Sequence, residues 1–257
     1  MTDGELQVEE IEETGFGWAE CVARCVGGVV RPGDRFDGDR LTVERLDRPL
    51  RRALPFIDPP HAVRVRFTGP GVPDLRPRLT VSTAGPRRYG YIGPPELRRA
   101  VPPDSPGGTP IRTAADFAAW AAAQSRTDLA APFTYVIDPT STLRLAPRPT
   151  EHVACAARGP VLSAGEITWT HEPDGSWSAT EVTNLSTGYA PDPSSWPSVA
   201  AALETAGLSH PGGFTFAFVF RRCPEAGCAQ LNVVREGVYE CAVCGAGLPE
   251  EWNAAGE

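Results

Sequence analysis

Lysine is absent from this chain, and each of its 24 Lys or Arg positions is an arginine. Arginine is always charged and presents a fork of donors, so carboxylate and phosphate groups can still be recognised without lysine. A GC-rich genome explains the bias, because alanine, proline and glycine are also abundant. The alternative explanation is selection against the modification of lysine side chains.

Long apolar runs are also missing, and no stretch approaches the roughly 18 apolar residues that a membrane-spanning helix needs. The first residues, MTDGELQVEEIEE, are acidic and lack the basic start and apolar run of a signal peptide. The seven cysteines are an odd number, which suits a disulfide framework poorly. We therefore expect a cytoplasmic protein with reduced thiols, in which clustered cysteines bind metal.

The charge is unevenly distributed along the 257 residues. The net charge of −8 and the pI of about 5.1 argue against a general binder of nucleic acid or membrane surfaces. Residues 31–99, however, carry 15 Arg against 8 Asp or Glu, and residues 151–257 carry 4 Arg against 13 acids. The two parts are either solvated surfaces of opposite sign, or the Arg-rich part binds an anionic partner such as nucleic acid.

Short strand patterns separated by Pro and Gly clusters fill residues 15–85, after an acidic N-terminal tail at residues 1–14. Many short strands with little helix predict a small β-barrel-like domain. The runs VRPGDRF, LTVERLDRPL and VRVRFTG resemble the second, β-barrel domain of translational GTPases, which implies a binding or spacer module. No phosphate-binding loop of the GxxxxGK[ST] type occurs, so the chain is not a GTPase.

Cys21 and Cys25 lie four residues apart in a strand pattern, which places both side chains on one face of the strand. Two thiols packed in the core explain this spacing. A metal-binding or redox-active pair is the alternative.

Residues 86–212 predict a central mixed α+β domain with antiparallel strands. Thr113 and Asp116 form a capping box that opens an alanine-rich helix. Four strand patterns follow, FTYVID, TLRLA, VLSAGEITWT and SWSATEVTN, the last two joined by a turn at Asp174-Gly175. A second helix begins near Ser194 or Ser195 and ends at Gly207.

The run from residue 151 to residue 193 resembles a module of plant IQ-motif calmodulin-binding proteins and of some bacterial effectors. The matching positions are His152, Ala164 to Glu166, Asp174-Gly175, and Ser186 to Pro191. Val153-Ala154 replaces the serines of the family pattern, and the last segment lacks its histidine. Some of these effectors are grouped with ADP-ribosyltransferase-like folds, so the resemblance implies an enzyme acting on a nucleotide-like anionic substrate.

The same segment brings acids, an imidazole and hydroxyl groups to turns at the ends of strands, where a ligand pocket can form. The candidate ligand-binding residues are His152, Glu166, Asn184, Ser186, Thr187 and Tyr189. The alternative is structural, with turn hydrogen bonds at Asn184 and Ser186, a packed Tyr189 and a core His152. The catalytic residues, if there are any, remain unknown from the sequence.

Four cysteines in residues 213–257 predict a zinc ribbon. Cys223 and Cys228 form one knuckle, Cys241 and Cys244 form the other, and a hairpin of 12 residues separates them. Four soft thiolates in a closed tetrahedral shell select one structural Zn²⁺ per chain over a redox-active metal. The Phe-rich run FTFAFVFRRC predicts a strand leading into the first knuckle.

The predicted fold class is therefore α+β and β-rich, with a small N-terminal β-barrel, a central α+β domain and a C-terminal zinc ribbon. We expect a zinc-containing binding or adaptor protein whose partner is a protein or a small anionic ligand, with no membrane partner. The alternatives are the nucleotide-directed enzyme and an RNA- or ribosome-associated factor that binds through residues 31–99.

Overall fold

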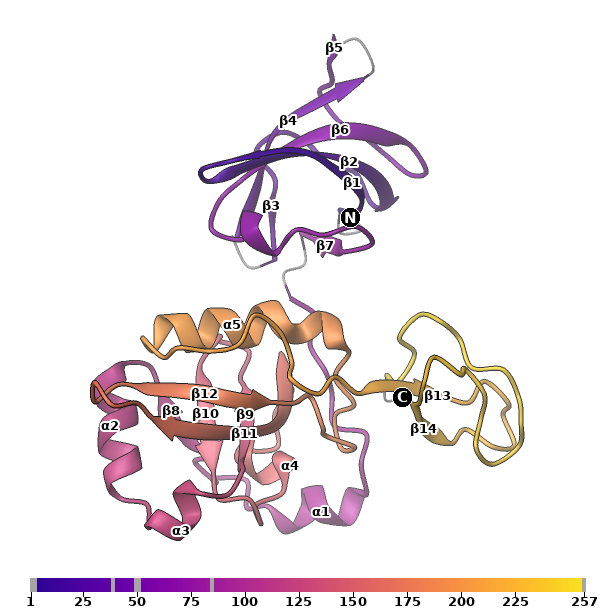
Figure 1. Cartoon of the computed structure of the whole chain (residues 1–257). Helices are drawn as coiled ribbons and strands as arrows, with labels where there is room; N and C mark the ends of the chain where they lie inside the picture. The colour runs from indigo at the N-terminus through magenta and orange to yellow at the C-terminus, as the bar shows by residue number, and fades with distance from the viewer. Residues whose placement is uncertain (1–3, 38–39, 49–51, 84–85, 256–257) are drawn as a thin grey trace. The chain divides into compact units, whose positions relative to one another are not determined.

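The chain divides into two compact units, Met1–Arg87 and Arg88–Glu257 (Figure 1). The computed structural model describes residues 4–37, 40–48, 52–83 and 86–255. The start of the predicted acidic tail, residues 49–50 of a predicted strand, the boundary at residue 85 and the end of the ribbon lie outside these residues. Antiparallel strands dominate both units, and the predicted α+β, β-rich class is confirmed. None of the described helices combines the length and the apolar character needed to cross a membrane.

The N-terminal unit is a nearly closed, barrel-like antiparallel sheet (Figure 1). Its strand order is β3-β4-β6-β2-β1-β7, and β5 pairs with β4. The strands are β1 (Glu5–Gly15), β2 (Trp18–Gly27), β3 (Arg35–Phe36), β4 (Leu41–Arg48), β5 (Arg52–Ala53), β6 (Ala62–Thr68) and β7 (Thr80–Ser82), and a 3-10 helix, η1 (Val72–Asp74), precedes β7. Asp37 follows β3, and its backbone N–H donates to the carbonyl oxygen of Ser82 over 3.0 Å. The Asp37 carboxylate also accepts the Ser82 N–H over 3.2 Å, so two hydrogen bonds join the ends of the sheet.

The predicted N-terminal tail is wrong, because its described residues belong to β1. This strand pairs with both β2 and β7. Leu6 and Val8 are fully buried, whereas Glu9, Glu10, Glu12 and Glu13 are exposed on the later part of the strand. The exposed acidic side chains of the later part of β1 explain why the sequence of a paired strand resembles that of a solvated tail.

Alternation along β2 directs Cys21 and Cys25 into the core of the barrel. Both thiols are fully buried and neither forms a disulfide. Burial raises the pKa of Cys21 to about 11, which keeps the thiol protonated. The Cys25 thiol donates to the Gly27 carbonyl oxygen over 3.4 Å. The two cysteines thus pack as small apolar residues.

The second unit is built on a five-stranded antiparallel sheet with the order β12-β11-β9-β10-β8. Its strands are β8 (Thr109–Ile111), β9 (Phe133–Ile137), β10 (Leu143–Ala146), β11 (Ser163–His171) and β12 (Trp177–Val182). The helices are α1 (Pro95–Ala100), α2 (Ala114–Ala122), α3 (Arg126–Leu129), α4 (His152–Cys155), the 3-10 helix η2 (Pro193–Ser195) and α5 (Trp196–Thr205). A two-stranded sheet, β13 (Val219–Arg222) with β14 (Leu231–Val234), carries the cysteine knuckles.

Strand β9 lies at the centre of this sheet, and its two faces belong to different cores. Phe133, Tyr135 and Ile137 pack in one core with residues of α2 and α5. Val136 packs in the other core with residues of α4 and with Tyr89 and Tyr189. All five residues of β9 are buried, which explains why its sequence shows a continuous apolar run.

Local signals placed helices α2 and α5 of this unit, whereas the short helices α3 and α4 were not predicted. Thr113 accepts the N–H of Asp116, and the Asp116 carboxylate accepts the N–H of Thr113, as a capping box requires. Phe117 and Trp120 of α2 are buried in the core. Gly207, with φ of 69°, follows α5 and ends it.

The predicted Phe-rich strand is shorter than its sequence suggests. Strand β13 begins at Val219, and Phe216 instead makes an isolated parallel bridge to Thr183 beside the end of β12. The Thr215 backbone N–H donates to the carbonyl oxygen of Val182 over 2.9 Å. The segment before β13 thus covers the edge of the central sheet, and this tertiary pairing outweighs the strand pattern.

Candidate metal centre

Four cysteine sulfurs converge at the β13–β14 hairpin. The Sγ atoms of Cys223, Cys228, Cys241 and Cys244 all lie within 4.8 Å of one another. The Sγ of Cys223 is 3.5 Å from that of Cys244, and the Sγ of Cys228 is 3.7 Å from that of Cys241. The two knuckles predicted from the spacing therefore face each other, and the four cysteines are close enough to hold a metal ion.

These separations fit a tetrahedral thiolate site and not a disulfide. Metal–sulfur bonds of about 2.3 Å in a tetrahedron place the sulfurs about 3.8 Å apart. A disulfide would require a separation of about 2.05 Å, and all four cysteines are free. Cys223 and Cys241 are buried, and Cys244 is exposed. Four protein ligands fill a tetrahedral shell, which is the arrangement of a structural metal site.

The backbone around the knuckles is held by short local hydrogen bonds. The Cys223 N–H donates to the Gln230 carbonyl oxygen over 2.8 Å, which continues the β13–β14 ladder past the first knuckle. The Cys241 N–H donates to the Ala246 carbonyl oxygen over 2.8 Å, and the Gly245 N–H donates to the Cys241 carbonyl oxygen over 2.9 Å. Gly245 has φ of 74°, a conformation that glycine adopts without strain.

Hydrogen-bond donors surround the Cys241 sulfur. The backbone N–H groups of Cys244 and Val243 lower the pKa of the Cys241 thiol to about 6, because they stabilise the thiolate. The side-chain amide of Asn232 adds a third donor, with its Nδ2 3.6 Å from the Cys241 Sγ. The Asn232 Oδ1 accepts the Ala242 N–H over 3.1 Å, so the same side chain also holds the backbone of the second knuckle.

Asn232 was not among the predicted site residues. It is buried, and it interrupts an otherwise apolar strand, LNVV. A lone amide in an apolar strand next to cysteine knuckles is the signal that could have identified it, since buried polar groups need partners.

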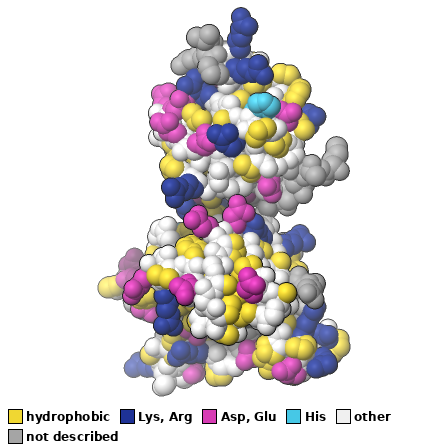
Figure 2. Space-filling view, turned by 90° about the vertical axis from the view of Figure 1, so that its right-hand side faces the viewer, with side chains coloured by type: hydrophobic (Ala, Val, Ile, Leu, Met, Phe, Trp, Pro, Cys, Tyr) yellow, Lys and Arg dark blue, Asp and Glu magenta, His cyan; other side chains and the backbone are white. Residues whose placement is uncertain are grey.

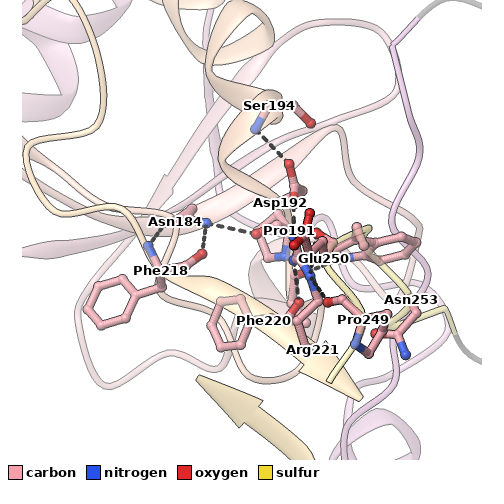
Figure 3. Close-up of polar contacts among 12 residues, drawn as sticks. Asn184, Pro191, Asp192, Ser194, Phe218, Phe220, Arg221, Pro249, Glu250 and Asn253 are labelled. Carbon is pink, nitrogen blue, oxygen red and sulfur yellow. Dashed lines mark hydrogen bonds and ion pairs between the residues drawn. The ribbon is translucent and has the colours of Figure 1, made fainter. Parts of the chain in front are cut away.

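The ribbon, residues 213–257, is fastened to the central sheet by a polar junction (Figure 3). The Asn184 Nδ2 donates to the carbonyl oxygens of Pro191 and Phe218, each over 2.7 Å, and its Oδ1 accepts the Phe218 N–H over 2.7 Å. Arg221 is buried and lies 3.3 Å from the Asp192 carboxylate. Its guanidinium also donates to the Glu250 carbonyl oxygen over 2.6 Å. The ribbon therefore shares one unit with the central fold instead of standing as a separate domain.

Trp252 extends this junction. Its indole N–H donates to the Ala190 carbonyl oxygen over 2.8 Å, and its ring packs edge-to-face on Tyr89 with centroids 5.2 Å apart. Trp252 thus holds the end of the described chain against the central fold.

The six polar residues of the predicted ligand-binding segment lie in three places: His152 in α4, Glu166 in β11, and the other four in the loop after β12. The His152 Nε2 lies 3.0 Å from the Gly165 carbonyl oxygen, and since a carbonyl only accepts, this nitrogen carries the proton. Burial lowers the pKa of His152. Glu166 follows Gly165 and lies 3.3 Å from the Arg148 guanidinium.

Three of the six residues, Asn184, Ser186 and Tyr189, are buried. The polar side-chain atoms of Asn184 and Tyr189 are hydrogen-bonded within the fold. Both the Nδ2 and the Oδ1 of Asn184 form hydrogen bonds at the junction to the ribbon. Tyr189 is fully buried, and its hydroxyl donates to the Gly159 carbonyl oxygen over 2.7 Å. Ser186 is also buried, and its hydroxyl has no hydrogen-bond partner among the described residues. Thr187 alone of the six is exposed.

Two glycines of this segment lie where another part of the chain comes too close for a side chain. A Cβ at Gly165 would lie only 1.9 Å from the Thr183 carbonyl oxygen, so no larger residue fits between β11 and the chain that follows β12. A Cβ at Gly188 would lie 2.7 Å from the Tyr91 ring, which itself packs on Tyr189 with centroids 5.5 Å apart. Packing therefore accounts for Gly165 and Gly188, two of the glycines at the matching positions.

No model of a known protein family matches the chain, and no curated protein matches its sequence. The resemblances to the calmodulin-binding module and to the translation-factor barrel therefore stay predictions.

Proposed function

We propose that this chain is a cytoplasmic, zinc-containing binding protein in which zinc holds the C-terminal ribbon in shape. The observation that carries the proposal is the set of four cysteine sulfurs within 4.8 Å of one another. Four thiolates select zinc over harder cations, and a closed shell leaves no position for a substrate. The metal then contributes folding energy instead of chemistry, because a ribbon of this size buries too little apolar surface alone.

The internal contacts of the central segment argue against catalysis by its polar residues. Asn184 and Tyr189, two of the residues proposed for a ligand pocket, satisfy their polar groups within the fold. Burial lowers the pKa of His152, and its Nε2 bonds to the Gly165 carbonyl oxygen. An enzyme acting on a nucleotide-like substrate would need such groups turned toward the substrate.

The Arg-rich residues 31–99 lend little support to an RNA-binding function. Several of these arginines pair with acids of the same unit, including Arg40 with Asp74 at 2.8 Å and Arg45 with Glu20 at 3.0 Å. Arg66 pairs with Glu20 at 3.1 Å. Paired arginines offer less positive potential to a phosphate backbone than the sequence count suggests.

Metal analysis of the full chain tests the proposal. We expect about one zinc per chain, and Cys241→Ser should lose the metal because three thiolates bind zinc far more weakly than four. Cys25→Ser is the matched control, since this buried cysteine lies in the barrel and should leave the zinc content unchanged. A wild-type protein purified without zinc, and unable to take it up under reducing conditions, would contradict the proposal.

A further inference from the structure

The exposed apolar side chains of the second unit collect in one part of the chain. Among its described residues, the large hydrophobic side chains that are exposed are Phe216, Val233, Val238 and Val243, all within residues 216–243. Val238 is 58% exposed and Val243 is 69% exposed. Phe216 lies beside Thr183 at the edge of the central sheet, and the three valines lie within eleven residues of the cysteine ribbon. Single exposed apolar residues need no explanation, whereas several on one small element mark a contact surface.

Carboxylates accompany these valines. Glu236 and Glu240 are both exposed, and each lies two residues from Val238, so their Cα atoms are within about 7.6 Å of its Cα. Neither glutamate has an ion pair among the described residues. Figure 2 looks onto the side of the molecule where the ribbon lies and shows hydrophobic and acidic side chains next to one another there.

The metal centre adds to this negative charge. Four thiolates and one Zn²⁺ carry a net charge of about −2, and the exposed Cys244 brings part of it to the surface. Arg235 is the one exposed arginine within residues 231–248. The negative potential repels nucleic acid and anionic lipid and attracts a cationic partner.

We propose that Val238, Val243, Glu236 and Glu240 form a docking face for a protein segment that carries Arg or Lys beside aliphatic side chains. We call these four residues the valine face. The proposal rests on the proposed function, because the ribbon presents this face only when the metal is bound. The aliphatic side chains of the partner would cover the valines, and its cations would pair with the glutamates at the rim.

Three synthetic peptides of about twelve residues test the face against the intact, zinc-loaded chain. One alternates Leu and Arg, one alternates Leu and Glu, and one alternates Ser and Arg. Fluorescence anisotropy should show at least about tenfold tighter binding of the Leu-Arg peptide than of either other peptide. Equal binding of the Ser-Arg peptide would show unspecific charge attraction and would overturn the proposal, as would tighter binding of a single-stranded oligonucleotide.

Substitutions then locate the site. The double variant Val238→Ser, Val243→Ser should weaken binding of the Leu-Arg peptide at least about tenfold, and Glu236→Gln with Glu240→Gln should weaken it and flatten its dependence on salt. Val26→Ser is the matched control, since Val26 is 43% exposed in the other unit. Unchanged binding by the valine variant overturns the proposal.

Nuclear magnetic resonance of the labelled wild-type chain separates loss of binding from loss of the fold. Adding the Leu-Arg peptide should shift the amide signals of residues 231–248, and shifts confined to other residues overturn the proposal. Sedimentation of the protein alone tests whether copies of the chain occupy the face. A dimer that the valine variant abolishes would overturn the cationic partner, because the face would then join two copies of this chain. If the protein holds one zinc per chain but does not bind the Leu-Arg peptide, the docking face is overturned while the proposed structural metal stands.

Discussion

The side-chain amide of Asn232 bridges the metal centre, with its nitrogen 3.6 Å from the Cys241 Sγ and its oxygen accepting the Ala242 N–H. Asn232 lies on β14, whereas Cys241 belongs to the second knuckle. The contact therefore ties the hairpin to the second knuckle, and it would offset part of the negative charge on the Cys241 sulfur in a metal-bound thiolate.

Asn232→Asp should release zinc to a chelator about 10- to 100-fold faster, because it replaces a donor beside a thiolate by a negative charge. Release is measured with a colorimetric chelator, and the cobalt-substituted protein should show a shifted thiolate-to-metal absorption band. Asn253→Asp is the control, since Asn253 bonds to Arg222 and to none of the cysteines. An unshifted cobalt band would mean that Asn232 only supports the backbone.

Tyr189→Ala should destabilise the second unit by about 3 to 5 kcal/mol, because it removes a fully buried aromatic ring. Tyr189→Phe keeps the ring and should cost about 1 to 2 kcal/mol, since the Gly159 carbonyl loses its hydroxyl donor. Denaturant unfolding of both variants provides the comparison. Wild-type stability in Tyr189→Ala would revive a ligand-binding role for this residue.

Stability should fall as the pH drops below about 6.5, and His152 should contribute to the loss. Burial lowers the pKa of His152 in the folded chain. At acidic pH the unfolded chain therefore takes up a proton that the folded chain does not, which favours unfolding. His152→Gln keeps a donor for Gly165 and does not titrate, so its melting temperature should fall less between about pH 7.5 and about pH 5.5.

Asn184→Leu should destabilise the second unit by about 2 to 4 kcal/mol. The substitution removes three hydrogen bonds and leaves the Phe218 N–H and the Pro191 carbonyl without partners. Hydrogen exchange should then accelerate at the Phe218 amide, at the point where the ribbon joins the sheet. Unchanged exchange at Phe218 would show that the junction does not depend on Asn184.

Features with local causes could be predicted from the sequence. The capping box at Thr113 and Asp116 depends on residues three apart, and the two knuckles depend on short cysteine spacings. The alternation that placed Cys21 and Cys25 on one face is equally local. In each case neighbouring residues in the chain supply the whole physical reason.

Features that depend on distant partners could not be predicted. The acidic residues of β1 look like a tail until β2 and β7 pair with the strand from either side. Phe216 fits a strand pattern but lies beside Thr183 at the edge of another sheet. The same holds for Asn232, whose sulfur partner is nine residues further along the chain.

The sequence by itself determined the cluster of four cysteines and the β-rich class, because cysteine spacing and strand alternation act over a few residues. Only the tertiary structure decided which hydrogen-bond partners the polar side chains between His152 and Tyr189 have. Whether a hydroxyl or an amide faces a ligand or a backbone carbonyl depends on which segment packs above it. Here Tyr91 covers Tyr189, and Phe218 meets Asn184.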